Sequence, residues 1–177
     1  MQERSDYEYL CQLLADGNIA LLEEASTILE DFPTGKDDYH HEQWITHAVA
    51  WGALSTIRWM LSKNVPLDVR EEDGRTLLHC AIDRAQADRY EVLELLLQHG
   101  APMDLHGLND WTPAHLAAAR NDVPALELLV RYGADLTLRT RIDDYATPLE
   151  EARHLKRQEA VRYLEQVALT HRGEIRR

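Results

Sequence analysis

The sequence has few cysteines and lacks a long apolar run. Its two cysteines, Cys11 and Cys80, lie far apart and form no CxxC pair, so we expect neither a disulfide framework nor a thiolate metal site, and both should be reduced packing residues. No apolar run approaches the ~20 residues of a membrane-spanning helix. The first ten residues carry charges where a signal peptide would be apolar. We expect a soluble, cytoplasmic protein.

Motifs of catalysis are also missing. The sequence has no GxSxG, no glycine-rich phosphate loop and no HExxH, so we expect no enzyme activity and no cofactor. Asp37 and Asp38 stand close to His40 and His41, but adjacent residues rarely supply a closed tetrahedral ligand set, and no metal is expected there. The alternative is a metal-dependent or enzymatic protein that uses residues 37–41, and metal analysis of the purified chain would decide it.

Positive charge is scarce in the first part of the chain. Residues 1–40 hold ten acidic side chains against two basic ones, residues 41–105 hold ten against six, and the remainder holds eleven of each. The net charge of −12 therefore lies before residue 106. Such a field repels nucleic acids and anionic membranes and speeds encounter with basic proteins. We expect a basic protein as partner, with acidity that serves only solubility as the alternative.

What the sequence does contain is an internal repeat. Three tetrapeptides recur at spacings of 36 and 35 residues: TLLH at 76–79, TPAH at 112–115 and TPLE at 147–150. A period of this size indicates stacked supersecondary units. Each threonine can cap a helix through its hydroxyl, and Pro113 and Pro148 suit the first helical position.

A second helix is predicted after each tetrapeptide. Its apolar residues follow the i, i+3, i+4 spacing of a buried stripe: Leu93, Leu96 and Leu97 in one unit, and Leu126, Leu129 and Val130 in the next. Gly100 and Gly133 stand where such a helix ends in a left-handed residue. A single hairpin cannot bury its apolar face, so units of this kind stack in arrays.

These motifs resemble the ankyrin repeat, with the TPxH tetrapeptide, the following alanine pair, the leucine pair and the closing Gly-Ala-Asp at their expected offsets; the match is firm over residues 73–138. The resemblance implies an all-α, ankyrin-repeat solenoid of about five stacked helix-turn-helix units with protruding fingers between repeats. We expect the chain to be a monomer on its own, with self-assembly through weak caps as the alternative. Residues 1–177 would form a single domain. Its expected parts are an amino-terminal cap helix pair (1–40), a repeat (41–72), a repeat with an insertion (73–108), a repeat (109–143) and a carboxy-terminal cap repeat with a tail (144–177).

Two segments depart from the repeat. The distance from the capping position to the first stripe residue is 17 residues between Thr76 and Leu93 but 14 in the other units, so three extra residues are expected within 83–90. The finger from Gly133 to Thr147 spans 14 residues where its counterparts span 12, and residues 138–145 should project further. Protruding loops on a rigid stack often carry function.

The resemblance also implies where a partner binds, because ankyrin-like arrays use their fingers and the exposed side of the first helices. Here these positions combine acids with aromatic side chains, which interfaces use for steering and affinity. The expected partner-binding residues are Asp37, Asp38, Tyr39, Trp51, Glu71, Glu72, Arg75, Asp110, Trp111, Arg120, Asp143, Asp144 and Tyr145. Further first-helix positions expected to face outward are His47, Cys80, Asp83, Arg84, Leu116, Ala119, Glu151 and His154.

The remaining aromatic and histidine side chains have a structural interpretation. Trp44 and Trp59 occupy core phases of the repeat, and His79 and His115 should bridge the threonine of the tetrapeptide to nearby backbone. We therefore expect a non-catalytic protein-binding module, an adaptor or inhibitor that docks a basic protein on its acidic finger and concave surface. An immunity protein that neutralises a basic toxin is a sharper alternative, motivated by charge asymmetry alone.

Overall fold

The computed structural model describes residues 2–142 and 145–174, with side chains described over residues 6–142 and 145–170. In these residues the protein contains ten α-helices and one short 3-10 helix, two isolated β-bridges and no strand. The predicted all-α class is confirmed. The chain divides into two compact units, residues 1–101 and 102–177.

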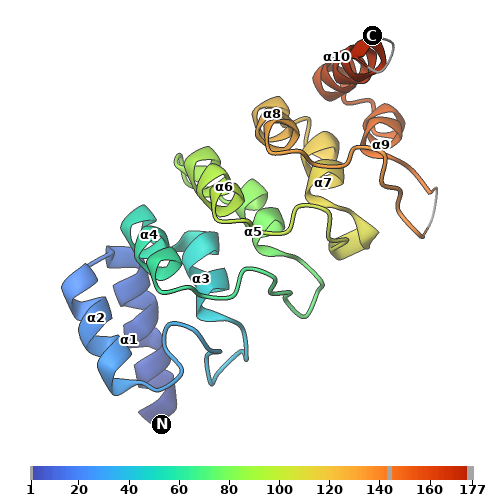
Figure 1. Cartoon of the computed structure of the whole chain (residues 1–177). Coiled ribbons are helices and arrows are strands. Elements are labelled where there is room, and N and C mark those ends of the chain that lie inside the picture. The colour runs from blue at the N-terminus through green and yellow to red at the C-terminus, as the bar shows by residue number, and fades with distance from the viewer. Residues whose placement is uncertain (1, 143–144, 175–177) are drawn as a thin grey trace. The chain divides into compact units, whose positions relative to one another are not determined.

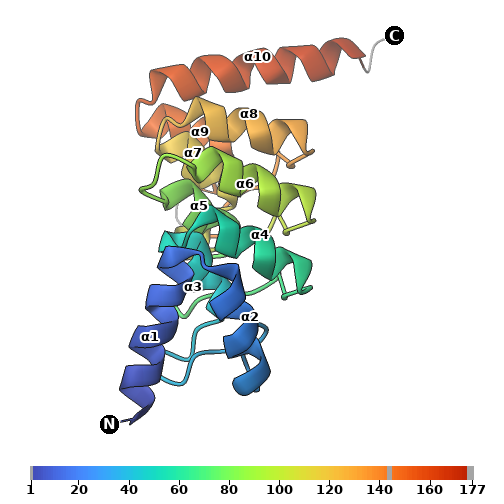
Figure 2. The ribbon, with the colours of Figure 1, turned by 90° about the vertical axis from the view of Figure 1, so that its left-hand side faces the viewer.

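The first unit consists of three helical hairpins (Figure 1). Its helices are α1 (Gln2–Asp16), α2 (Ile19–Ile28), α3 (Trp44–Trp51), α4 (Leu54–Ser62), α5 (Leu77–Asp83) and α6 (Arg89–Gln98). The first helices of the hairpins, α1, α3 and α5, lie side by side, and so do the second helices α2, α4 and α6 (Figure 2). Residues 17 and 18 separate α1 from α2 in the opening helix pair.

A continuous apolar seam holds these two layers of the first unit together. Leu14, Leu22, Ile57, Met60 and Leu96 are all fully buried between them. Each buried side chain of this size contributes roughly 1.5–3 kcal/mol relative to an exposed one. The stripe predicted from the leucine spacing is therefore the core of this unit.

Two tryptophans extend the apolar core of the first unit near its amino-terminal end. Trp44 and Trp59 are buried, as predicted, and both rings pack against Phe32. The indole N–H of Trp59 donates to Glu23 Oε1 at 2.8 Å, which supplies the polar partner that a buried tryptophan needs.

The second unit repeats the arrangement with two hairpins and a 3-10 turn. Its elements are η1 (Leu108–Asp110), α7 (Pro113–Ala119), α8 (Val123–Arg131), α9 (Pro148–His154) and α10 (Gln158–Glu174). Within this unit α7 packs beside α9, and α8 packs beside α10. Among the residues that the structure describes in either unit, none of the helices has the length and apolar character that crossing a bilayer requires.

The recurrent threonines begin the first helices, as the tetrapeptides predict. Thr76, Thr112 and Thr147 each form a capping box with the residue three positions later, which is His79, His115 or Glu150. In this arrangement the side chain at the third position accepts a hydrogen bond from the threonine N–H. A histidine ring and a glutamate carboxylate therefore perform the same capping task in this fold.

The second helices end in left-handed residues. Gly100 and Gly133 have φ values of +81° and +91°, and Asn64 takes the equivalent place after α4 with φ +56°. Asparagine tolerates this region better than most residues with a side chain, which explains how it replaces glycine there.

The extra residues of the second repeat lengthen the turn after α5. Five residues, 84–88, connect α5 to α6, whereas three connect α7 to α8 and α9 to α10. Arg84 in this turn is buried, and its guanidinium donates to the backbone oxygens of Val49 at 2.9 Å and Gly52 at 2.7 Å. It also pairs with Asp88. The insertion therefore caps the carboxy-terminal end of α3, where helix carbonyls lack partners.

Several positions predicted to face outward are buried. They are His47, Cys80, Arg84, Leu116 and Ala119. The reason is visible in the first unit, where α3 is flanked by α1 on one side and α5 on the other, so that little of a first helix stays exposed. The expectation for these five residues is wrong, whereas Asp83, Arg120 and His154 are exposed.

Candidate functional site

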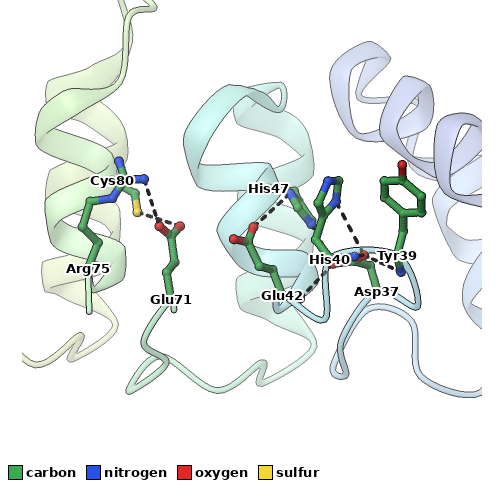
Figure 3. Close-up of polar contacts among 8 residues, drawn as sticks. All are labelled: Asp37, Tyr39, His40, Glu42, His47, Glu71, Arg75 and Cys80. Carbon is green, nitrogen blue, oxygen red and sulfur yellow. Dashed lines mark hydrogen bonds and ion pairs between the residues drawn. The ribbon is translucent and has the colours of Figure 1, made fainter. Parts of the chain in front are cut away.

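Polar side chains of the first unit gather where two fingers meet the first helices. The first finger (residues 29–43) connects α2 to α3, and the second finger (residues 63–76) connects α4 to α5. Figure 3 shows acids from both fingers pointing toward side chains of α3 and α5. We refer to this group as the finger row; it contains Asp37, Tyr39, His40, Glu42, His47, Glu71, Arg75 and Cys80.

Asp37 organises the first finger. Its Oδ1 accepts hydrogen bonds from the backbone N–H groups of Tyr39 (2.9 Å) and His40, and its Oδ2 accepts from the N–H of Glu42 (2.9 Å) and from His47 Nε2 (3.0 Å). The carboxylate is completely buried. Burial by itself would raise the pKa of Asp37, but the four hydrogen bonds outweigh it and hold the pKa below its usual value.

His47 connects the first finger to α3. Its Nε2 faces Asp37, and its Nδ1 lies 3.8 Å from Glu42 Oε2, so the ring has a carboxylate on each side. Because a carboxylate only accepts hydrogen bonds, the hydrogen-bonded Nε2 must carry a proton. The ring is nearly buried, which makes this contact part of the finger's support.

The second finger repeats this design with different residues. Cys80 is the fourth residue of α5, as His47 is of α3, and its Sγ donates to Glu71 Oε1 at 3.2 Å. Arg75 Nη2 lies 3.2 Å from Glu71 Oε2. In both repeats a helix side chain thus holds an acid of the preceding finger.

The acids of the two fingers influence one another. Burial raises the pKa of Glu71, and the negative charges of Glu42 and Asp73 add to the increase, while the Cys80 thiol and Arg75 oppose it. Burial, followed by the adjacent Glu71, also raises the pKa of Cys80. Cys80 is therefore a thiol at neutral pH, in keeping with its predicted role as a reduced packing residue.

Aromatic rings cover the first finger. Tyr7 of α1 stacks on Tyr39 at a centroid distance of 5.4 Å and meets His40 edge-on at 5.1 Å. Tyr39 remains 54% exposed, and it therefore offers an aromatic surface to solvent beside the buried Asp37.

The predicted partner-binding residues of the second unit form a separate group. Asp110, at the end of η1, pairs with Arg141 of the last finger (residues 132–147), and these hydrogen bonds lower the pKa of Asp110 to about 2. Arg139 of the same finger pairs with Glu150 at 2.7 Å. Tyr145 is 62% exposed, and Trp111 is half-buried.

The predicted residues differ in their access to a partner. Asp38, Tyr39, Glu72, Arg120 and Tyr145 are exposed, and a further group is half-buried: Trp51, Glu71, Arg75, Asp110 and Trp111. Asp37 is buried, so its carboxylate cannot face a partner, and its role is to position the finger. Asp143 and Asp144 lie outside the described residues. Sequence reasoning missed the inward contact of His47.

One part of the finger row has the composition of a metal site. Asp37, His40 and His47 each offer a ligand atom, and these atoms lie within 4.8 Å of one another. This set differs from the adjacent residues 37–41 that the sequence offered as an alternative, because it joins the finger to α3.

Comparison with known proteins identifies the same repeats. A family model described as ankyrin repeats (many copies) matches residues 45–88, and one described as ankyrin repeats (3 copies) matches residues 85–168. The solved ankyrin repeat domain of Bcl-3, described as a unique member of the IkappaB protein family, is similar with a TM-score of 0.61 and 26% identity; the match covers 70% of this chain and 51% of that one.

Two relatives of the chain are much longer proteins. The human BCL-6 corepressor-like protein 1 is 30% identical over 66% of the chain, and the mouse RelA-associated inhibitor is 32% identical over 59% of it. The chain spans only 6% and 12% of their lengths. With its capping threonines, paired helices and left-handed repeat ends, the chain belongs to the ankyrin repeat family.

Proposed function

We propose that this ankyrin repeat protein is a non-catalytic adaptor or inhibitor that docks a basic protein on the acidic fingers of its first unit. Ankyrin repeats are protein-binding modules, which supports the general role. The basic character of the partner and the docking surface are inferred from charge and from one cavity.

The cavity beside the first finger carries this proposal. It has a volume of about 260 Å³ and is lined by residues of α1 and of the first finger and by Trp44 of α3. Buried rings of Phe32 and Trp44, with the half-buried Tyr7, form its aromatic part. Its lining also carries four acids, Asp6, Glu30, Asp31 and Asp38, together with the basic Lys36.

This combination suits a lysine or arginine side chain of a partner. The alkyl part of such a side chain packs on aromatic rings, and its charge is attracted both by the face of a ring and by nearby carboxylates. The exposed Tyr39 next to the cavity supplies the kind of aromatic contact on which interface affinity depends. We therefore place the basic anchor of the partner at residues 30–38.

One relative supports the inhibitory form of this function. The mouse protein is named a RelA-associated inhibitor, and it is 32% identical to this chain over the shared repeats. An inhibitor that covers its target would use an extended surface of the kind that the fingers offer. An immunity protein that neutralises a basic toxin would be a special case of the same function.

Charge reversal at the cavity tests the proposal. The variant Asp31→Lys/Asp38→Lys changes two exposed acids of the first finger. The matched control Glu24→Lys/Glu127→Lys changes two exposed acids on α2 and α8 by the same total charge. Each protein is immobilised, incubated with native lysate and analysed by quantitative mass spectrometry.

We expect the wild type and the control to capture the same basic protein and the finger variant to lose it. Capture should weaken steeply as salt rises, because exposed charges are screened within roughly 10 Å at 0.1 M ionic strength. If the finger variant captures the protein as well as the control does, the partner binds elsewhere and this docking surface is wrong.

A further inference from the structure

Asp37, His40 and His47 present three ligand atoms to one point of the first finger. His47 Nε2 lies 3.0 Å from Asp37 Oδ2, and His40 Nδ1 lies 3.8 Å from Asp37 Oδ1. All three ligand atoms lie within 4.8 Å of one another. We propose that these three side chains bind one Zn²⁺ ion.

The distances are close to those that a zinc ion needs. Zinc binds nitrogen and oxygen ligands at about 2.0–2.2 Å in a tetrahedron, which places neighbouring ligand atoms about 3.3 Å apart. The Asp37 and His47 atoms already have a spacing of this size. His40 is the ligand that must move toward the other two, and its half-exposed side chain can rotate without disturbing the core.

The surroundings hold two of the ligands in place. Backbone N–H groups of Tyr39, His40 and Glu42 fix the Asp37 carboxylate and leave the side of Oδ2 that faces His47 for the metal. Glu42 Oε2 lies 3.8 Å from His47 Nδ1. A carboxylate beside the second nitrogen of a metal-binding histidine is the arrangement that orients the ring and directs its other nitrogen toward the metal.

The donor set favours zinc over the hard cations. Two imidazole nitrogens and one carboxylate suit Zn²⁺, whereas Mg²⁺ and Ca²⁺ take sets made almost entirely of oxygen. Three protein ligands leave the fourth position of the tetrahedron to a solvent molecule on the side of the exposed His40. The site is a binding site in a finger, and no reaction is assigned to it.

The competing explanation is that Asp37 and His47 form only a hydrogen bond that supports the finger. The two explanations differ at His40. The hydrogen bond between Asp37 and His47 does not need the His40 imidazole, whereas a three-ligand site does. His40 is also the safest position to change, because its side chain is 47% exposed.

Zinc titration of the whole chain, purified without a polyhistidine tag, tests the site. Isothermal titration calorimetry measures affinity and stoichiometry for the wild type, for His40→Ala and for His41→Asn. His41 is the matched control, since it is an exposed histidine next in the chain with a left-handed φ of +58°, a region that asparagine also adopts. Titration with Co²⁺, followed by its visible absorption, reports the ligand geometry independently.

We expect one Zn²⁺ per wild-type chain, unchanged binding by His41→Asn, and a loss of affinity of more than about 10-fold in His40→Ala. The intense absorption of four-coordinate Co²⁺ should appear with the wild type and disappear with His40→Ala. Absence of zinc binding by the wild type, equal binding by His40→Ala, or equal binding of Mg²⁺ would each overturn the proposal.

Discussion

His115 Nε2 lies 2.9 Å from the backbone oxygen of Ala146, 31 residues further along the chain. The Nδ1 atom of the same ring accepts a hydrogen bond from the backbone N–H of Thr112 at 3.2 Å. One imidazole therefore caps the start of α7 and holds the end of the finger that leads into α9. Both contacts require a neutral ring with its proton on Nε2, because a proton on Nδ1 would face the N–H of Thr112.

The stability of the fold should therefore fall in mild acid. Burial lowers the pKa of His115, only partly offset by the hydrogen bond to Ala146. A depressed folded-state pKa contributes stability that is present above the unfolded-state value, about 6.5, and is lost as pH falls toward the folded-state value. Urea unfolding at about pH 7.5 and 5.5 should show this loss in the wild type.

The variant His115→Gln isolates this contribution. Glutamine at this position of a capping box can still accept from the N–H of Thr112, as Glu150 does from Thr147 in the next repeat, but it does not titrate. We expect His115→Gln to be less stable than the wild type at the higher pH, and the difference to shrink at the lower pH. A constant difference between the two proteins would show that His115 is not the titrating group.

Replacing Asp37 by asparagine should destabilise the first finger. The side-chain amide of the variant would present an N–H₂ group where Asp37 accepts hydrogen bonds, so a backbone N–H such as that of Glu42 would lose its acceptor. The expected cost is about 2 kcal/mol at neutral pH, measured by urea unfolding. The neighbouring exposed Asp38→Asn should change the free energy of unfolding by less than about 0.5 kcal/mol.

The same variant has a second signature in acid. Because the pKa of Asp37 is lowered in the fold, its stabilising contribution is present above the unfolded-state pKa of about 3.9 and is lost as pH falls through the folded-state value. Asp37→Asn lacks this titration, so its stability relative to the wild type should recover in acid. Equal pH dependence of the two proteins would contradict the assignment.

Arg84→Met should be far more costly than Arg58→Met. Arg84 is buried and donates hydrogen bonds to three backbone oxygens and to Asp88. Loss of these hydrogen bonds should cost about 2–3 kcal/mol. Arg58 makes one exposed ion pair with Glu91, which is worth at most about 1 kcal/mol. Similar unfolding free energies for the two variants would refute the capping role of Arg84.

The double variant Trp111→Ala/Tyr145→Ala tests the predicted contact residues of the second unit. Both residues belong to loops and not to helices, so circular dichroism should show unchanged helical content. We expect the captured partner to bind more weakly, because aromatic residues contribute much of the energy of an interface, although the anchor proposed at residues 30–38 is unchanged. Tyr9→Ala, which removes an exposed aromatic ring from α1, serves as the control. Retained binding by the double variant would restrict the interface to the first unit.

The helices of the repeats could be predicted from the sequence because their start and end residues agreed with the spacing of the apolar residues. The threonines at 76, 112 and 147 cap helices, and Gly100 and Gly133 end them, each through contacts within a few residues. Capping and left-handed termination depend on the residue type at one position, so they can be predicted without knowing which residues pack nearby in the fold.

The contacts of the finger row and of the turn after α5 could not be predicted in the same way. His47 and Arg84 occupy positions that the repeat leaves outward in an isolated hairpin, and each turns inward through partners 10 and more than 30 residues away. The five-residue turn was foreseen as an insertion, but nothing in its composition indicated that an arginine would cap α3. Contacts of this range depend on how a finger folds over the helix that follows it and on how one repeat packs on the next.

The guanidinium of Arg84 connects two neighbouring repeats of the first unit and should make them unfold together. Val49 and Gly52 belong to one repeat and Arg84 to the next, so separating the two repeats would leave helix carbonyls without partners and the Arg84 guanidinium with Asp88 alone. Arrays of repeats open according to the strength of each junction between neighbours. The backbone amides of α3 to α6 should therefore exchange their hydrogens through one cooperative unfolding event, and not hairpin by hairpin.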